Sequence, residues 1–258
     1  MDIDVALVPQ VARPDDPAVF IVVDEIRAST TITTLLDLGC SDIYIEGALE
    51  AARRRGRETG SILVGERHLR RPAGFDFTNS PMMLARAGVH GGSAVLSTAN
   101  GTAMLRMLRR SRHVLVGCLR NARACGEAAV RLAEAQGVGI RVVCAGRLRR
   151  FVQEDAVAAG VIVSRIVEAA AARGIETNLT DAAMVAVRLR DAYPDTLTAL
   201  LDSDGGRVLR EIGQEEDIPF CAEVDMTDTV PILRGGSPMR IERLRLDLCE
   251  YRPILPRG

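Results

Sequence analysis

The sequence predicts an α/β fold in which repeated strand-turn-helix units form mixed sheets covered by helices. Three segments carry this prediction, and they start near residues 19, 93 and 139. Each begins as a short apolar run, passes through a polar turn and continues with helical spacing. This is the order of a βαβ unit, so we expect parallel strands mixed with antiparallel ones.

The first unit opens with the apolar run from Val19 to Val23, which ends at Asp24. The next residues place Ile32 and Leu36 at helical spacing, and Gly39 is the type of residue that commonly ends a helix. The following segment, Asp-Ile-Tyr-Ile-Glu-Gly, alternates like a strand. The second and third units repeat this layout without repeating its sequence, so an internal duplication remains open.

A strand starting at Ser61 leads into a long loop between the first two units. Long loops in α/β domains are usually functional or disordered, and this one carries several charged and amide side chains. The C-terminal third is expected to be helical from about Thr180 to Gly213, and then extended over 217–233. We expect residues 1–240 to form one α/β domain, with a division into two lobes left open, and residues 241–258 to form an edge strand or tail.

The composition excludes several classes of function. The chain has no lysine, which rules out Schiff-base catalysis and a P-loop lysine. Its net charge is −1 and only 3% of its residues are aromatic, so a nucleic-acid partner is not expected. The three histidines show no zinc spacing. Neither a P-loop nor a G-x-G-x-x-G follows a strand, which argues against nucleotide binding.

The cellular context can also be estimated from the sequence. The first ten residues lack the basic and apolar regions of a signal peptide, and no apolar stretch is long enough to span a bilayer. The six cysteines form no C-x-x-C pair and are expected to be buried free thiols. We therefore expect a cytoplasmic protein without a membrane partner. A homodimer is an expectation from general frequency alone.

Three strand ends carry side chains suited to an anionic ligand, because ligands of α/β sheets bind where strands end and helices begin. The first holds Asp24, Arg27, Ser29 and Thr30, the second Asn100, Gly101 and Thr102, and the third Gly146 and Arg147, followed by Glu154 and Asp155. Carboxylates could hold a hard cation and arginine could bind phosphate. Helix capping and turn formation are the alternative roles of these residue types.

Taken together, the motifs resemble the 2-phosphosulfolactate phosphatase family in order and spacing. They are VVDEIRAST, GERHLRRPAGFDFTNSP, TANGT, CLRNA, CAGR…EDAVAAG and DIPFCAEVD…VP. The resemblance runs from about residue 3 to residue 240. It implies a Mg²⁺-dependent phosphatase with an α/β fold, which releases sulfolactate and phosphate on a route to coenzyme M.

The resemblance also implies a set of site residues, which we carry over by position. The catalytic candidates are Asp24, Glu66, Asp76 and Asp155, and the metal candidates are Asp24, Glu66 and Asp155. The candidates for binding the anionic substrate are Arg27, Ser29, Thr30, Arg67, Asn79, Ser80, Asn100, Gly101, Thr102 and Asn121. We add Arg147 to them because of its place at the third strand end, not by carry-over from the family. Gly74, Gly146 and Glu154 also match the family motifs.

This chain departs from the family pattern in three places. Glu25 replaces an aliphatic residue, the segment 68–71 replaces small residues, and the Gly146 loop is rich in arginine. We expect these changes to add charge near the mouth of the site, so the substrate could differ from the nominal one.

The expected reaction is hydrolysis of a phosphomonoester by an oriented water, with Mg²⁺ neutralising the phosphoryl oxygens. A mechanism with Asp24 as a phosphorylated nucleophile is a rival, although the pattern it needs has an Asp where this chain has Ile26. A non-catalytic sensor of phosphorylated or sulfonated metabolites is the rival from another class.

Overall fold

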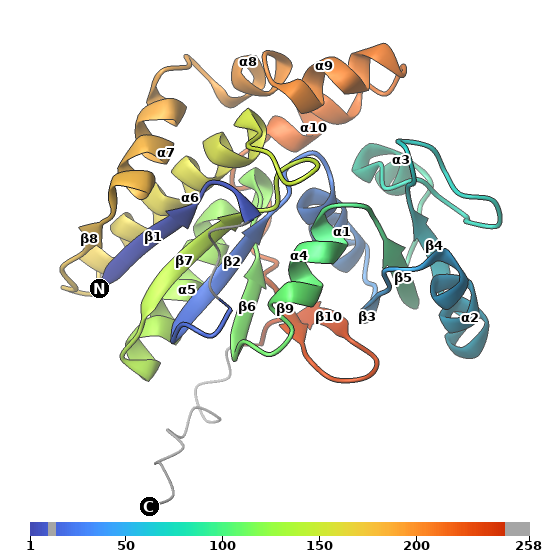
Figure 1. Ribbon diagram of the computed structural model, residues 1–258, viewed down its shortest axis with the longest axis horizontal. Helices are drawn as coiled ribbons and strands as arrows, with labels where there is room; N and C mark the ends of the chain where they lie inside the picture. The colour runs from blue at the N-terminus through green and yellow to red at the C-terminus, as the bar shows by residue number, and fades with distance from the viewer. Residues whose placement is uncertain (10–13, 246–258) are drawn as a thin grey trace, which may run out of the picture.

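The computed structural model describes residues 1–9 and 14–245 and contains one ten-stranded mixed sheet (Figure 1). The order of the strands is β4-β5-β3-β10-β9-β6-β2-β7-β1-β8. Their bounds are β1 Asp2–Ala6, β2 Ala18–Val23, β3 Asp42–Ile45, β4 Ile62–Gly65, β5 Ser93–Ser97, β6 His113–Val116, β7 Gly139–Cys144, β8 Asn178–Leu179, β9 Pro231–Arg234 and β10 Arg240–Arg243.

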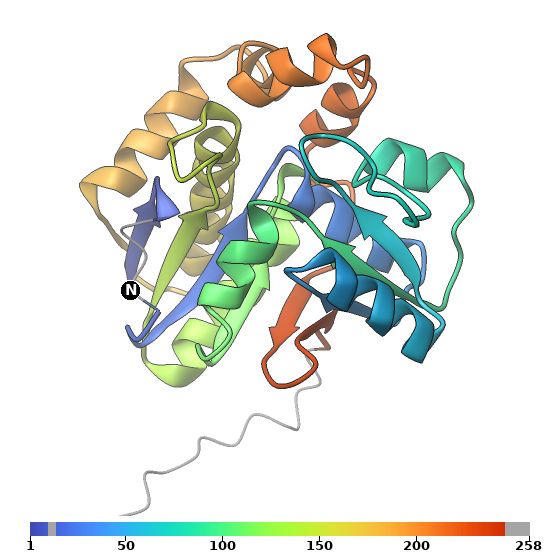
Figure 2. The ribbon, with the colours of Figure 1, turned by 45° about the vertical axis from the view of Figure 1, so that its right-hand side comes forward.

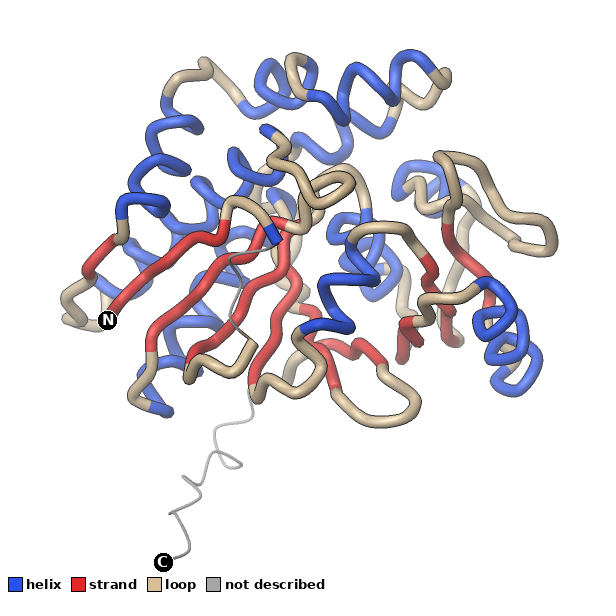
Figure 3. Tube along the Cα trace, viewed as in Figure 1, coloured by secondary structure: helices blue, strands red, loops and turns tan. Residues whose placement is uncertain are grey.

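Helices cover both faces of this sheet, which confirms the predicted α/β class (Figure 3). The α-helices are α1 Ala28–Asp37, α2 Leu49–Thr59, α3 Pro81–Arg86, α4 Gly101–Met107, α5 Ala122–Gln136, α6 Gln153–Ala171, α7 Asp181–Asp191, α8 Thr196–Leu201, α9 Asp204–Glu211 and α10 Asp217–Ala222. A short 3₁₀ helix, η2, spans Leu119–Asn121. No described helix has the length and apolar character needed to cross a membrane.

The sheet consists of two parallel groups joined by an antiparallel hairpin. Strands β4, β5 and β3 are parallel to one another, and so are β6, β2, β7, β1 and β8. Between the groups, β10 and β9 pair antiparallel with each other and with their outer neighbours. Three successive antiparallel pairings separate the groups, so the two groups run in opposite directions along the sheet.

The chain contains a structural repeat whose first strands are exchanged. The order β2-α1-β3-α2-β4-α3 recurs as β5-α4-β6-α5-β7-α6, with η2 added before α5. However, β2 lies between β6 and β7 of the second repeat, and β5 lies between β3 and β4 of the first. Each parallel group is therefore built from both repeats. The layout that the sequence suggested is real, but its strands are intertwined.

Buried strand residues alternate between two large cores. Val19, Ile21 and Val23 of β2 face a core that also contains residues of α5 and α6. Phe20 and Val22 face the other core, which is formed with α1, α4 and strands of both groups. Burial of both faces explains the continuous apolar run of β2, as in other parallel sheets. In Figure 2, α4 lies between the two groups of strands.

The C-terminal third differs in two ways from the prediction. The expected helices up to Gly213 are present as α7, α8 and α9, but the stretch expected to be extended begins with helix α10. Pro219 does not prevent this helix, because it lies in the first turn of α10, where the missing N–H has no intrahelical partner to lose. Only Pro231–Arg234 at the end of that stretch is a strand.

Residues 241–258 were expected to form an edge strand or tail, and the last described strand, β10, falls partly within this range. It pairs with both β3 and β9, so it lies inside the sheet. The rest of the expected tail, 246–258, lies outside the described residues, as do residues 10–13. The division of the chain at residue 240 and into lobes stays a prediction. Among the described residues, the five cysteines are free and buried, as expected.

Candidate active site

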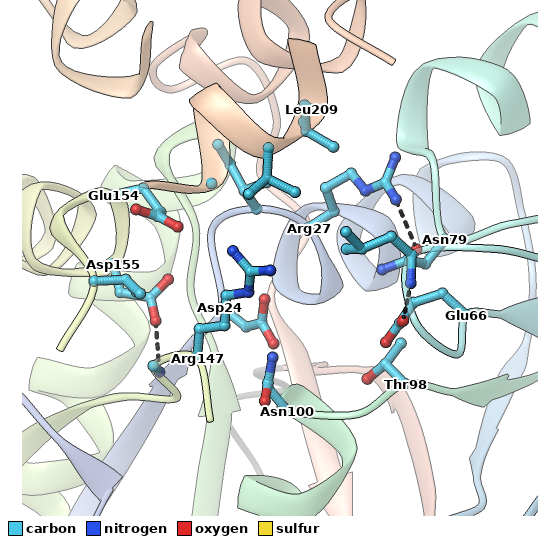
Figure 4. Close-up of a pocket in the computed structure, with 16 residues that line it drawn as sticks. Asp24, Arg27, Glu66, Asn79, Thr98, Asn100, Arg147, Glu154, Asp155 and Leu209 are labelled. Atoms are coloured by element: carbon cyan, nitrogen blue, oxygen red, sulfur yellow. Dashed lines mark hydrogen bonds between the residues drawn. The ribbon is translucent and has the colours of Figure 1, made fainter. Parts of the chain in front are cut away.

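A polar pocket of about 590 Å³, including its solvent-open part, collects residues that follow strands of both groups (Figure 4). Asp24 follows β2, Glu66 follows β4, Thr98 follows β5 and Gly146 follows β7. The other lining residues are Ile26, Arg27, Leu69, Asn79, Asn100, Arg147, Val152, Glu154, Asp155, Gly205, Val208 and Leu209. The exchanged strands β2 and β5 thus each bring their carboxyl ends to one site.

Asp24 lies at the floor of the pocket, and only 8% of it is exposed. Its Oδ1 accepts an N–H from Ala28 at 3.3 Å, and its backbone N–H donates to Ser29 Oγ at 2.9 Å. Burial raises the pKa of Asp24 to about 6, and the nearby Glu66 carboxylate adds to this shift. A Cβ on Gly101 would lie 2.8 Å from Asp24 Oδ2, so the glycine permits the start of α4 to approach the carboxylate.

Asp155 and Glu154 in the first turn of α6 form the acidic wall beside Asp24. Asp155 accepts the N–H of Glu25 and the N–H of Gly146, both at 2.8 Å. Burial, followed by repulsion from Asp24 and Glu154, holds the pKa of Asp155 well above its usual range. Burial also raises the pKa of Glu154, whose Oε2 is buried without a hydrogen-bond partner.

Glu66 stands on the opposite side of the pocket (Figure 4). Its Oε1 accepts the N–H of Ala99 at 2.9 Å, and its Oε2 accepts the N–H of Leu69 at 3.1 Å. These bonds connect the ends of β4 and β5 and fix the orientation of the carboxylate. Asn100 lines the pocket below Asp24 in Figure 4, and its Oδ1 accepts the Leu148 N–H at 3.4 Å.

Arg27 lines the pocket, but its guanidinium is occupied by neighbouring side chains. It is 3% exposed and forms an ion pair with Asp217 at 2.6 Å. It also donates to Gln214 Oε1 at 2.5 Å and to Asn79 Oδ1 at 3.1 Å. These contacts connect the β2–α1 turn to α10 and to the loop before α3. Neither Asp217 nor Gln214 was a site candidate from the sequence, because they lie 190 and 187 residues from Arg27 along the chain.

Arg147 is the more accessible arginine of the pocket. It pairs with Asp204 at the start of α9 at 3.1 Å, and the two side chains are 36% and 52% exposed. Figure 4 shows the Arg147 side chain extending into the pocket above Asp24. The positive charge available near the carboxylates therefore lies mainly on Arg147.

The pocket brings together several of the residues expected from the sequence. They are Asp24, Arg27, Glu66, Asn79, Asn100, Arg147 and Asp155. The structure adds residues that we did not expect to take part: Thr98 and the apolar side chains of α9, Val208 and Leu209. The α9 residues carry no motif. The clue for Thr98 was its place in the Thr-Ala-Asn-Gly-Thr turn.

Other expected site residues lie outside the pocket lining and form local structure. Ser29 and Thr30 bond to the turn around Asp24 and Glu25, and Thr102 bonds to Thr98. Asn121 is fully buried, accepts the Cys118 N–H and donates to Val116 and Thr229 carbonyls. Ser80 caps α3 and donates to Asp217 at 2.7 Å.

Arg67 and Asp76 are likewise not part of the pocket lining. The Arg67 guanidinium donates to the carbonyl groups of Glu66, Ser97 and Gly47. Asp76 is exposed, and its Oδ2 accepts the N–H of Leu63 in edge strand β4 at 2.7 Å. In these positions Arg67 and Asp76 stabilise the strand ends and the loops that follow them.

Glu25 does not add charge at the mouth of the pocket, contrary to our expectation. It is fully buried, and its carboxyl group accepts the Leu119 N–H at 3.0 Å and the Thr30 hydroxyl at 3.2 Å. Burial raises its pKa to about 8. At neutral pH this side chain is therefore largely a neutral acid inside the core. The other two departures do face outward: Arg70 and Arg149 are exposed.

The fold and the pocket place this chain among α/β proteins with a small-molecule site at the strand ends, where arginine and amide donors suit an anionic ligand. Comparison with known proteins identifies the family. A sequence model described as 2-phosphosulpholactate phosphatase matches residues 5–236. The chain belongs to this family, as its motifs predicted.

Curated relatives agree with this assignment over most of their length. A protein of Thermus thermophilus named a probable 2-phosphosulfolactate phosphatase is 37% identical over 222 residues, covering 85% of this chain and 89% of the relative. A Deinococcus radiodurans protein of the same name is 34% identical, covering 95% and 98%. One from Thermotoga maritima is 31% identical, covering 91% and 96%.

Proposed function

We propose that this protein is a Mg²⁺-dependent phosphatase that hydrolyses 2-phosphosulfolactate to sulfolactate and phosphate. The observation that supports it most is a set of three buried carboxylates in one pocket, Asp24 and the acidic wall of Glu154 and Asp155, all with raised pKa values. Membership of the family and the names of its curated relatives supply the substrate.

The donor chemistry of the acidic wall fits a hard divalent cation. Glu154 Oε2 is buried without a partner, and Asp24 and Asp155 repel each other in the same pocket. The described residues contain no ready-made group of three metal-binding side chains. Mg²⁺ does not need one, since it usually keeps several waters and binds one or two carboxylates plus substrate phosphate. Of the metal candidates from the sequence we keep Asp155, and Glu154 takes the place of Asp24 and Glu66, so Glu154 and Asp155 would hold it.

When bound, Mg²⁺ would neutralise phosphoryl oxygens and template the attack of water. Asp24 lies between the acidic wall and Glu66, where it would orient the water and accept its proton. The water oxygen bonds to phosphorus, the ester P–O bond breaks, and the leaving alcohol oxygen takes up the proton that Asp24 received from the water. Asn100 and Arg147 would donate to the anionic substrate, and the apolar face of α9 would limit access of bulk water.

The decisive test is release of phosphate from 2-phosphosulfolactate by the purified protein, with Mg²⁺ and with excess chelator. We expect metal-dependent turnover well above that on phenyl phosphate. Replacement of Asp24 and Glu66 together by Asn and Gln should abolish it. Unchanged turnover in that double variant would contradict the proposed chemistry. Tight binding without turnover would instead favour a sensor.

The role of Glu154 can be tested without an activity assay. Glu154→Gln keeps the size of the side chain but removes its charge, so Mg²⁺ affinity measured by calorimetry should fall about tenfold or more. Glu211→Gln, at the exposed end of α9, is the matched control and should leave the affinity unchanged. Equal affinities in all three proteins would rule out Glu154 as a ligand.

A further inference from the structure

Two turns of the same kind follow the equivalent strands β4 and β7. Arg67 and Arg70 exchange backbone N–H···O bonds of 3.0 and 3.1 Å, and Arg147 and Arg150 exchange bonds of 3.1 and 2.9 Å. The two middle residues of each turn have positive φ: His68 51° and Leu69 64°, Leu148 50° and Arg149 64°. The repeat therefore holds Arg67 and Arg147 at equivalent places after their strands.

The side chains of these equivalent arginines have different tasks. The Arg67 guanidinium makes four bonds to the ends of neighbouring strands, including one to Ser97 Oγ at 3.0 Å. Arg147 pairs with Asp204 at the surface. Exposed pairs of this kind contribute little to stability, so a competing anion can displace Asp204. Arg67 is part of the scaffold, whereas Arg147 has an exchangeable partner.

The backbone at Arg147 is fixed, so exchange of partners needs movement of the side chain alone. The preceding residue, Gly146, donates its N–H to Asp155 at 2.8 Å. A Cβ on Gly146 would lie 2.3 Å from the Arg150 carbonyl oxygen, which shows how closely the turn is packed there. The backbone from which the Arg147 side chain extends is therefore held in place by the Asp155 carboxylate of the acidic wall.

Depth in the pocket separates Arg147 from the reacting groups. Asp24, Glu154 and Asp155 are 8%, 3% and 2% exposed, whereas Arg147 and Asp204 stand at the mouth. A substrate whose phosphate reaches the carboxylates must leave its other groups nearer the mouth. The carboxylate of Asp204 already occupies the Arg147 guanidinium there, in the way that an acid group of a substrate would.

We propose that Arg147 determines specificity by binding a carboxylate or sulfonate of the substrate, a group that takes no part in the reaction. Asp204 competes with this group for the Arg147 guanidinium. The inference rests on the proposed function. It predicts selectivity for phosphomonoesters with a second acid group on a small carbon skeleton. Substrate binding replaces the Asp204–Arg147 pair by a pair between Arg147 and the acid group of the substrate, so the start of α9 loses its ion pair with the Arg147 turn.

The test compares three substrates: 2-phosphosulfolactate, 2-phospholactate, which lacks the sulfonate, and phenyl phosphate, which lacks any second acid group. Arg147→Gln should lower kcat/KM for 2-phosphosulfolactate roughly 10- to 100-fold, the range for loss of a hydrogen bond to a charged group, and far less for phenyl phosphate. Asp204→Asn should lower KM for 2-phosphosulfolactate about 2- to 5-fold. The response of 2-phospholactate shows whether carboxylate or sulfonate is bound.

Two matched controls carry the same charge changes. Arg150→Gln removes an exposed arginine from the same turn, and Glu211→Gln removes an exposed carboxylate from the same helix. Both should leave the three substrates' kinetic constants unchanged. Equal losses on all substrates in Arg147→Gln, or the same loss in Arg150→Gln, would overturn the proposal. So would a raised KM in Asp204→Asn, since Asp204 would then support Arg147 instead of competing.

A binding measurement separates this inference from the proposed function. Sulfolactate contains the acid groups without the phosphate, and its calorimetric affinity should fall in Arg147→Gln and not in Arg150→Gln. Absence of turnover on every phosphomonoester, with this pattern of binding retained, would refute the phosphatase and support the role of Arg147. Turnover with equal sulfolactate affinity in both variants would refute the role of Arg147 alone.

Discussion

Asp24 and Glu25 are neighbours in the chain, yet their carboxyl groups lie in different environments. Asp24 faces the pocket, whereas Glu25 faces the protein interior, where its acceptors are satisfied by Leu119 and Thr30. The pKa of Glu25 is about 8 because of burial. Between pH 4.5 and 8 the folded protein therefore holds a proton that the unfolded chain releases.

This proton predicts how stability depends on pH. The unfolded state binds fewer protons in this range, so the free energy of unfolding falls as pH rises, by at most about 1.4 kcal/mol per pH unit from this group. In Glu25→Gln the metal-free protein should lose most of that dependence between pH 6 and 8 and be the more stable protein at pH 8. Urea unfolding in chelator measures it. Parallel pH profiles for the wild type and the variant would show that Glu25 is ionised in the fold.

Gly205 allows α9 to touch the acidic wall. A Cβ there would lie 2.3 Å from Glu154 Oε1 and 3.3 Å from the Ile26 Cβ. Gly205→Ala should displace Glu154, weaken Mg²⁺ binding and lower kcat on the order of 10²-fold, as misplacement by about an ångström does. Steady-state kinetics and calorimetry measure both effects.

The control for Gly205→Ala is a glycine that is closely packed against another helix, away from the pocket. Gly126 of α5 packs against the backbone of α6, where a Cβ would meet Arg165 and Ile166 atoms at 3.1 Å. Gly126→Ala should lower stability while leaving Mg²⁺ affinity unchanged. If both variants lost metal affinity equally, general destabilisation would explain the result.

Sequence reasoning named pocket residues at strand ends and missed residues that the tertiary fold brings to the pocket. Asp24, Asn100 and Arg147 could be named because a strand, a polar turn and a helix start are visible locally. Asp76 could not be separated from them by residue type, although it bonds to edge strand β4 instead. Asp217 begins one of the family motifs, but its role could not be predicted, since its partner Arg27 is separated from it by 190 positions.

Among the elements, α10 and α3 are joined to the β2–α1 turn by one buried carboxylate. Asp217 is 2% exposed; it pairs with Arg27, and its Oδ1 accepts bonds from Ser80 Oγ and the Met82 N–H. An extended reading of residues 217–222 therefore missed a helix that anchors part of the pocket. The sequence contained the relevant spacing, because the buried Ile218, Cys221 and Ala222 lie on one helical face.

Removal of this carboxylate should destabilise the protein strongly. Asp217→Ala leaves the Arg27 charge buried and unpaired, which costs about 3–5 kcal/mol of unfolding free energy. The neighbouring Glu216 pairs with Arg86 at the surface, where the side chains are 62% and 65% exposed. Glu216→Ala should therefore change stability by about 1 kcal/mol or less. Similar effects of the two substitutions, measured by urea unfolding, would contradict this account of the buried pair.

Across the whole molecule, the exchanged strands make each parallel group depend on both repeats. The α/β class could be predicted because local patterns decide it, but the exchange could not, because strand order is set by pairing between distant segments. Strand β2 pairs with residues about 95 and 120 positions away along the chain. Neither repeat can complete a sheet alone.

The interdependence predicts cooperative opening. In native-state hydrogen exchange, amides in the middle of β2 and β5 should exchange with free energies within about 1 kcal/mol of each other and of global unfolding. Leu96→Ala in β5 should lower both values together, because it opens a cavity in the core that contains strands of both groups. Loss of protection in β4, β5 and β3 alone would show that the groups open independently.

The repeat also has a consequence in terms of symmetry. On either side of the β9–β10 hairpin, the strand order is that of two repeats related by a two-fold axis that have exchanged their first strands. In a homodimer with this strand order, the two halves would have the same sequence and therefore the same side chains. In one covalent chain that constraint is absent. Asp24 and Thr98 occupy the ends of corresponding strands, and Arg67 and Arg147 begin corresponding turns, yet each pair is divided between different tasks. Because both repeats belong to one chain, equivalent positions can carry different residues, and a pseudo-symmetric fold holds an asymmetric pocket.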